Sequence, residues 1–228
     1  MVKFDHIIHY VNQLEEVEQE PVLPVHSGGK HERFGTANLL SYFDYRYVEY
    51  LAIEDEAAFN QHLKDASESF AKTIDALGYE EGFIRYALST DDIEALSERF
   101  RARGFSTAGP VGMERTTEGE TISWRLLYVQ SEKEIFPFFI QWDEPEPDRL
   151  KRIEALRGDF ITPSIIIQHD VVDIRPWKSF YDVLGIWEGE IDSHTRVALS
   201  QSTKPSITLK MATDGESAVY KGAVYKFI

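Results

Sequence analysis

The chain has 228 residues, of which 43% are hydrophobic and 13% aromatic, enough for the core of one large domain or two small ones. It contains no cysteine, which excludes disulfides, thiolate nucleophiles and cysteine-type zinc sites. Its net charge of −15 repels phosphate backbones, so we expect no nucleic-acid partner.

Neither a membrane span nor an export signal is evident in the sequence. No run of about 18 apolar residues occurs. The first residues, MVKFDHIIHYV, lack the long apolar stretch and the small-residue cleavage site of a signal peptide. We therefore expect a cytoplasmic protein without a membrane partner.

The first predicted unit, residues 1–55, follows the plan strand, helix, three strands. FDHIIHYV (4–11) alternates as an opening strand, and Asn12 is suited to cap the short helix that follows. The three further strands are predicted near residues 22–25, 34–43 and 45–53.

The second predicted unit, residues 82–143, repeats this plan after a helical insertion at 54–82. GFIRYALS (82–89) opens it, and TDDIEALSERFRARG has the acidic start, the basic end and the final glycine of a helix. Its strands are predicted near residues 109–115, 121–129 and 136–142.

A third, shorter copy is predicted after the connector at 144–159. SIIIQHDV (164–171) opens it, and a helix capped by Asp173 follows. Its strands are predicted near residues 186–191, 195–200 and 206–211. For both connectors, 54–82 and 144–159, the charged composition predicts packing and a solvated face, without chemistry.

These repeats predict an α+β fold of βαβββ units that form curved mixed sheets around a cleft. One such sheet leaves an apolar face uncovered by its single helix, so two units side by side enclose a shared cleft suited to a small molecule. We place a domain of two units at 1–148 and an additional βαβββ-like unit at 149–228.

Glu49 is the most informative residue of the chain, because it stands in the middle of an aromatic, alternating strand. A lone ionised carboxylate there costs several kcal/mol unless it is paired, hydrogen-bonded or bound to a metal. The opening strands offer His6 and Arg85 as partners, and Gln141 is the matching polar residue of the last strand of the second unit. Taken singly, each of the three also fits a structural role.

Further residues are predicted to border the cleft. The glycine-containing stretch GGKHERFGTANL carries His31 and Asn38, which we expect to hydrogen-bond a ligand, with simple turns and an exposed histidine as the alternative. Trp124 fits a wall of the pocket or the core. The sequence has no P-loop, dinucleotide fingerprint, GxSxG or HExxH motif.

Several of these stretches resemble the vicinal oxygen chelate superfamily, which includes glyoxalase I, extradiol dioxygenases and bleomycin-resistance proteins. More narrowly, the chain is similar to glyoxalase-like domain proteins. The resemblance spans Val2 to Asp143 and is carried by FDHIIHYV, GGKHERFGTANLLSYFDYRYVEYLAIED, GFIRYALSTDDIEAL, RARGF and PFFIQWD.

The resemblance implies a metal site with ligands from the first and last strands of two units. His6 and Glu49 match the pair of the first unit, and zinc, nickel, manganese or iron suits such donors. Arg85 stands at the ligand position of the second unit, and Gln141 stands near the position of its acid. A guanidinium has no lone pair for a cation, which counts against glyoxalase I and dioxygenase activity.

Two classes of function follow, and the sequence leaves both open. The first is a metal-assisted lyase or isomerase for a small oxygenated metabolite, with Glu49 as the catalytic base. The second is a metal-free binding protein in which Arg85 grips an anionic ligand. A structural member, its cleft closed over an Arg85–Glu49 pair, is a third option. For the enzyme and for the binding protein, the expected partner is a small molecule.

The third unit is predicted to give no ligand to the main site. Its opening strand has Ile166 at the position aligned with Arg85, and its sheet has an apolar face that must be covered. The first two units or a second copy of the chain would cover that face. We therefore expect a homodimer.

Overall fold

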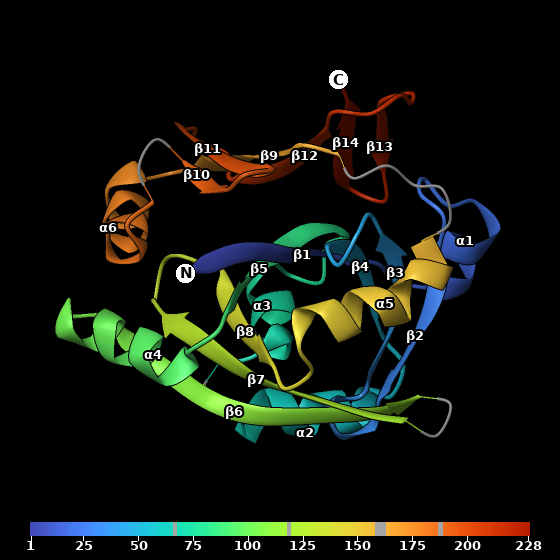
Figure 1. Cartoon of the computed structure of the whole chain (residues 1–228), viewed down its shortest axis with the longest axis horizontal. Helices are drawn as coiled ribbons and strands as arrows, with labels where there is room; N and C mark the ends of the chain where they lie inside the picture. Colours follow the sequence, from blue (N-terminus) through green and yellow to red (C-terminus); the bar gives the residue numbers. More distant parts are fainter. Residues whose placement is uncertain (66–67, 118–119, 158–162, 187–188) are drawn as a thin grey trace.

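The computed structural model describes residues 1–65, 68–117, 120–157, 163–186 and 189–228. The described strands form two sheets, one of eight and one of six strands (Figure 1). This is the mixed α+β architecture with curved sheets that the repeats predicted.

The first unit supplies one half of the eight-stranded sheet. Its elements are β1 (Val2–Tyr10), α1 (Leu14–Gln19), β2 (His26–His31), the short 3-10 helix η1 (Glu32–Phe34), β3 (Thr36–Tyr42) and β4 (Tyr47–Ile53). The strand predicted at 22–25 lies instead at β2, whose sequence HSGGKH has little strand propensity of its own and is held by its pairing with β3.

The second unit supplies the other half, after the helices α2 (Glu56–Asp65) and α3 (Phe70–Ala76). Its elements are β5 (Gly82–Thr90), α4 (Ile93–Ala102), β6 (Ser106–Thr117), β7 (Glu120–Gln130) and β8 (Phe138–Trp142). Helix α4 begins where the side chain of Asp92 accepts a hydrogen bond from the amide of Ala95.

The strand order of the large sheet is β2-β3-β4-β1-β5-β8-β7-β6. The two opening strands, β1 and β5, pair antiparallel at its centre, and each pairs in parallel with the last strand of its own unit. The two edge strands, β2 and β6, also contact each other, so the sheet curves strongly around one of its faces. We call that inner side the cavity face and the opposite side the outer face.

The C-terminal part begins with α5 (Glu146–Arg157) and continues as the six-stranded sheet. Its elements are β9 (Ile165–Val171), α6 (Ile174–Leu184), β10 (Glu190–Asp192), β11 (Thr195–Gln201), β12 (Ser206–Met211), β13 (Ala218–Tyr220) and β14 (Ala223–Phe227). Residues 187 and 188, within the strand predicted at 186–191, lie outside the described part of the chain.

The small sheet is a reduced version of the large one. Its order is β10-β11-β9-β12-β14-β13, with β9 and β12 antiparallel at the centre. Strand β9 pairs in parallel with β11, and β12 pairs in parallel with β14, as β1 pairs with β4 and β5 with β8. The sequence interpretation took 206–211 as the closing strand of one unit. In the structure β12 opens a second half that is built from β12 to β14.

The small sheet covers the outer face of the large sheet (Figure 1). One continuous core joins Phe4, Ile7 and Val48 of the large sheet to Ile167 and Trp177 of the C-terminal part. The apolar face of the third unit is therefore covered within the same chain. The homodimer stays a prediction, but the need to cover that face no longer supports it.

Arg46 ties the two sheets together at the turn between β3 and β4. Its side chain is 1% exposed and bonds Asp44, the hydroxyl of Thr195 and the carbonyl of Pro163. Among the described helices, none combines the length and apolar character that crossing a bilayer requires.

Candidate active site

A cavity of about 280 Å³ lies on the cavity face of the large sheet. The surface of its wall is mainly apolar, and the polar side chains of His6, Asn38 and Glu49 line it together, beside further polar residues such as Arg33 and Glu68. The aromatic lining comes from η1, β4, α2, α3, β7 and β8, as Phe34, Tyr47, Phe59, Phe70, Trp124, Tyr128, Phe138 and Trp142. A site of this size and character suits a small molecule with few polar groups.

Glu49 and His6 lie side by side in this wall. The Nε2 atom of His6 is 3.4 Å from Oε2 of Glu49, and the two side chains are 3% and 7% exposed. Asn38, on the neighbouring strand β3, donates its side-chain amide to Oε1 of Glu49. The His6 ring lies between Tyr47, stacked at a centroid distance of 4.5 Å, and Phe138 at 5.4 Å.

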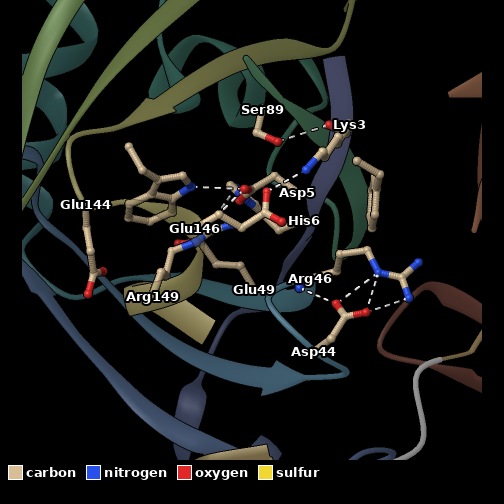
Figure 2. A network of polar contacts seen from close by, with 12 residues as sticks. Lys3, Asp5, His6, Asp44, Arg46, Glu49, Ser89, Glu144, Glu146 and Arg149 are labelled. Carbon is tan, nitrogen blue, oxygen red and sulfur yellow. Dashed lines mark hydrogen bonds and ion pairs between the residues drawn. The ribbon is translucent and has the colours of Figure 1, made fainter. Parts of the chain in front are cut away.

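Behind His6 lies Asp5, which is fully buried. One carboxylate oxygen is 2.7 Å from Nδ1 of His6, and the other accepts hydrogen bonds from Trp142 Nε1 at 2.9 Å and from Arg149 Nη1 at 3.0 Å (Figure 2). Strict alternation would send Asp5 and His6 to opposite faces. A register shift between Phe4 and His6 in the β1–β5 pairing brings them together, as β-bulges do beside functional sites.

The charge of Asp5 is held by its neighbours. Burial acts to raise the pKa of this carboxyl, but the Arg149 cation and the hydrogen bond from His6 outweigh it and hold the pKa below its usual value. Asp5 is therefore ionised, and it accepts the Nδ1 proton of His6. This assignment leaves Nε2 of His6 to face Glu49 and the cavity.

Arg85 lies in the same sheet but has other partners than Glu49. Its side chain is 2% exposed, and its guanidinium bonds the carbonyl of Phe136 at 2.6 Å and Glu68 and Thr73 at 3.0 Å each. It does not line the cavity, whereas Glu68 does. The salt bridge between Arg85 and Glu49 that the sequence allowed is absent from the described structure, and Arg85 pairs with Glu68.

The strand pairing defines which residues of the two units are equivalent. Ile7 and Tyr86 face each other at the centre of the β1–β5 ladder, and a half-turn about that pair exchanges His6 with Arg85. Ile8 pairs with Glu49, and its equivalent Ala87 pairs with Phe138. The register thus places Phe138, rather than Gln141, at the position equivalent to Glu49.

Gln141 points away from the cavity. Its side-chain carbonyl accepts a hydrogen bond of 2.8 Å from the amide of Ile93 at the start of α4, while its neighbours Ile140 and Trp142 line the cavity. Trp124 lines the cavity and is 7% exposed. His31 lines it as well, with Nδ1 3.1 Å from the hydroxyl of Thr36.

Both connectors reach the site, which corrects the expectation that they carry only solvated charge. Helix α2 brings His62 to the cavity wall, Glu68 reaches it just before α3, and α5 brings Arg149 to Asp5. Burial lowers the pKa of His62, and the nearby Arg33 cation lowers it further. The polarity of α5 could not reveal this, because a buried arginine and an exposed one look alike in a charged helix.

Comparison with known proteins agrees with this fold. The family described as "Glyoxalase-like domain" matches residues 4–167. The chain belongs to the glyoxalase-like domain family. Curated proteins offer no match. A solved structure of a hypothetical protein from Staphylococcus aureus is 28% identical, with a TM-score of 0.86 over 100% of this chain and 99% of that one.

More distant structures share the fold alone. The Mn(II)-bound glyoxalase from Novosphingobium aromaticivorans has 14% identity and a TM-score of 0.51, covering 92% of this chain and 65% of that one. Homoprotocatechuate 2,3-dioxygenase from Arthrobacter globiformis has 16% identity and a TM-score of 0.52, covering 95% and 65%. The family match and this shared fold agree with the resemblance of the chain to the vicinal oxygen chelate superfamily.

The glyoxalase-like site fits a divalent metal only in part. Among the described residues, no group of three or more His, Asp and Glu side chains is placed to hold an ion. His6 Nε2 and Glu49 Oε2 are 3.4 Å apart, about the separation of two ligands on a tetrahedral ion with bonds of about 2.1 Å. The equivalent positions of the second unit hold Arg85 and Phe138, and neither can donate a lone pair to a cation.

Proposed function

We propose that this glyoxalase-like protein is an enzyme of the lyase or isomerase type, which moves a proton on a small molecule bearing a carbonyl or hydroxyl group. The observation that carries the proposal is the contact of Glu49 with His6 in the wall of an aromatic cavity, with Asp5 behind His6. A base and a proton carrier within reach of each other are the parts such a reaction needs.

The proposed roles follow from the hydrogen bonds. Glu49 is the base, because Asn38 occupies one of its oxygens and leaves the other beside His6. His6 accepts or returns a proton at Nε2, while Asp5 holds Nδ1 protonated and stabilises the imidazolium that forms. The apolar part of the wall lowers the local dielectric constant, which strengthens the electrostatic interactions among these groups.

A divalent metal, whether zinc, nickel, manganese or iron, would be held by His6 and Glu49, with water or ligand as its other donors. When bound, it would polarise the oxygen atoms of the substrate as a Lewis acid. Such a two-residue site predicts weaker binding than a complete set of protein ligands would give.

A metal-free binding protein is the second candidate. It is favoured because Arg85 and Phe138, which cannot bind a cation, occupy the two remaining ligand positions. The anionic ligand first considered for Arg85 would have to displace Glu68, which already bonds that guanidinium. A small, mainly apolar ligand with one hydrogen-bonding end agrees better with the wall of the cavity.

Solvent-deuterium incorporation tests the proposed reaction. We would incubate the protein in D₂O with a panel of small hydroxy-ketones, keto-acids and hydroxylated aromatic molecules, and follow each C–H signal by NMR. Wild-type protein should exchange at least one compound, and Glu49→Gln should lower that rate by about 10²- to 10⁴-fold. Glu54→Gln, whose side chain is 43% exposed, is the matched control and should retain the rate.

The outcomes separate the two candidates. A compound that binds by ligand-detected NMR but never exchanges, with equal affinity for Glu49→Gln, would support the binding protein and refute the enzyme.

Calorimetric titration with Zn²⁺, Ni²⁺, Mn²⁺ and Fe²⁺ tests the metal separately. Equal metal affinity in the His6→Ala, Glu49→Ala double variant would exclude these residues as ligands. Light scattering would test the expected homodimer.

A further inference from the structure

We propose that Gly28 is a positioning residue, whose missing side chain makes the space in which Asn38 holds Glu49. Gly28 lies in β2, in the glycine-containing stretch for which turns alone were the simple explanation. Its own backbone does not require glycine, since its φ lies outside the positive range. The reason for glycine at this position is therefore steric.

The steric argument rests on two distances. A Cβ atom on Gly28 would lie 2.0 Å from Oδ1 of Asn38 and 2.9 Å from Cγ of Leu40. Non-bonded carbon atoms approach optimally to about 3.5–4.0 Å, so the side chains of both Asn38 and Leu40 would have to move. The register shift between Ser27 and Gly29 leaves Gly28 without a partner opposite in β3 and turns it toward these side chains.

Asn38 is held from two sides, by Glu49 and by the backbone of Gly28. It is 4% exposed, and its amide nitrogen faces Glu49, which orients the group because a carboxylate accepts only N–H. Its Oδ1 atom is buried and has no hydrogen-bond partner within the described residues. The contact with Glu49 and the bare backbone of Gly28 together hold the side chain, and any group on Gly28 would push the amide off the carboxylate.

This proposal rests on the proposed function only in the consequence for catalysis, since the contact itself can be measured without a substrate. We would follow the side-chain amide protons of Asn38 by NMR. In wild type they should exchange with solvent at least about tenfold more slowly than those of Asn60, which is exposed. Gly28→Ala should abolish this protection.

Gly112→Ala is the matched control. Gly112 is also a strand glycine, without positive φ, and no described atom lies within 4 Å of the Cβ it lacks. This variant should keep the protection of Asn38. Gly28→Ala could unfold the chain because its new methyl group clashes with Leu40. In that event we would compare the Gly28→Ala, Leu40→Ala double variant with Leu40→Ala alone, which isolates the effect on Asn38. Retained protection in either Gly28→Ala background would overturn the proposal.

Activity gives the second readout. For a compound that wild type exchanges, Gly28→Ala and Asn38→Ala should each lower the rate by about tenfold, the size expected for an outer partner of a site. The double variant should lower the rate no further, because both substitutions remove the same contact, that of Asn38 with Glu49. Additive losses would overturn the proposal. If Gly28→Ala loses the protection of the Asn38 amide protons but wild type exchanges the C–H protons of no compound, the role of Gly28 would be supported and the proposed enzyme refuted.

Discussion

Replacing Arg149 by methionine removes the cation that holds Asp5 behind His6. Asp5 is 0% exposed and Arg149 is 5% exposed, and their oxygen and nitrogen atoms are 3.0 Å apart. Removing one partner of a buried ion pair costs about 3–5 kcal/mol, because the remaining charge stays buried. In a chain of this size about 1 kcal/mol shifts the melting temperature by about 2–4 °C, so we expect a decrease of about 10 °C.

The pH dependence of this loss has a definite sign. In wild type the pKa of Asp5 is lowered, so its contribution to stability is present above its ordinary pKa, near 4, and is lost as the pH falls through the folded value. Without the Arg149 cation, the pKa of Asp5 rises relative to wild type, and protonation then relieves the buried charge. The stability difference between wild type and Arg149→Met is therefore largest near neutral pH and narrows as the pH falls through about 4.

Thermal denaturation followed by circular dichroism at pH 7 and at pH 4 measures both effects. Arg175→Met is the matched control, because that arginine also pairs with an aspartate but its side chain is 86% exposed, so its melting temperature should hardly change. The Arg149→Met, Asp5→Asn double variant should recover part of the loss. The reasoning would be refuted if Arg149→Met melted with the Arg175→Met control.

Three further outcomes are expected. Arg46→Met should lower the free energy of unfolding in urea by about 3 kcal/mol, since it leaves buried acceptors unpaired between the two sheets; a loss below about 1 kcal/mol would contradict the contact. Burial lowers the pKa values of His9 and His169 to about 4, so both stay neutral in the folded chain. Because the unfolded chain binds these protons more readily, each histidine should lower the free energy of unfolding by about 3 kcal/mol as the pH falls from 6.5 to 4. Urea titrations of His9→Gln and His169→Gln should show a flatter pH profile than wild type. Phe138→His should tighten Zn²⁺ binding in calorimetry by supplying a third ligand, and unchanged affinity would show that the equivalence with Glu49 is misplaced.

The repeated plan of the large sheet could be predicted from the sequence because its strands alternate and its α4 helix has clear start and stop signals. Glu49 was found for a physical reason as well, since a carboxylate in a buried aromatic strand needs a partner. Strand β2 was placed too early, because HSGGKH contains little of the composition that marks strands, and its pairing with β3 supplies what its residues lack.

Asp5 and Arg149 could not be predicted as neighbours of the site. Alternation assigns Asp5 to the face opposite His6, and only the register shift in β1 brings the two residues together. Arg149 stands in a charged helix whose burial depends on where α5 packs. Arg85 was predicted as a partner of Glu49 or of an anionic ligand, but it pairs with Glu68 in the helical insertion, which no pattern in the sequence connects to β5.

Strand β1 separates two hydrophobic clusters by a single layer of backbone, one cluster on the cavity face and one on the outer face. His6 lines the cavity and Ile8 and Tyr10 pack in the hydrophobic cluster on the cavity face, whereas Phe4 and Ile7 pack in the core shared with the C-terminal sheet. Selection on this strand must satisfy both sides at once, so few substitutions there can be neutral. New specificity would evolve more freely in α2, α3 and the edge strand β6, where one change alters the lining of the cavity without disturbing the join between the two sheets.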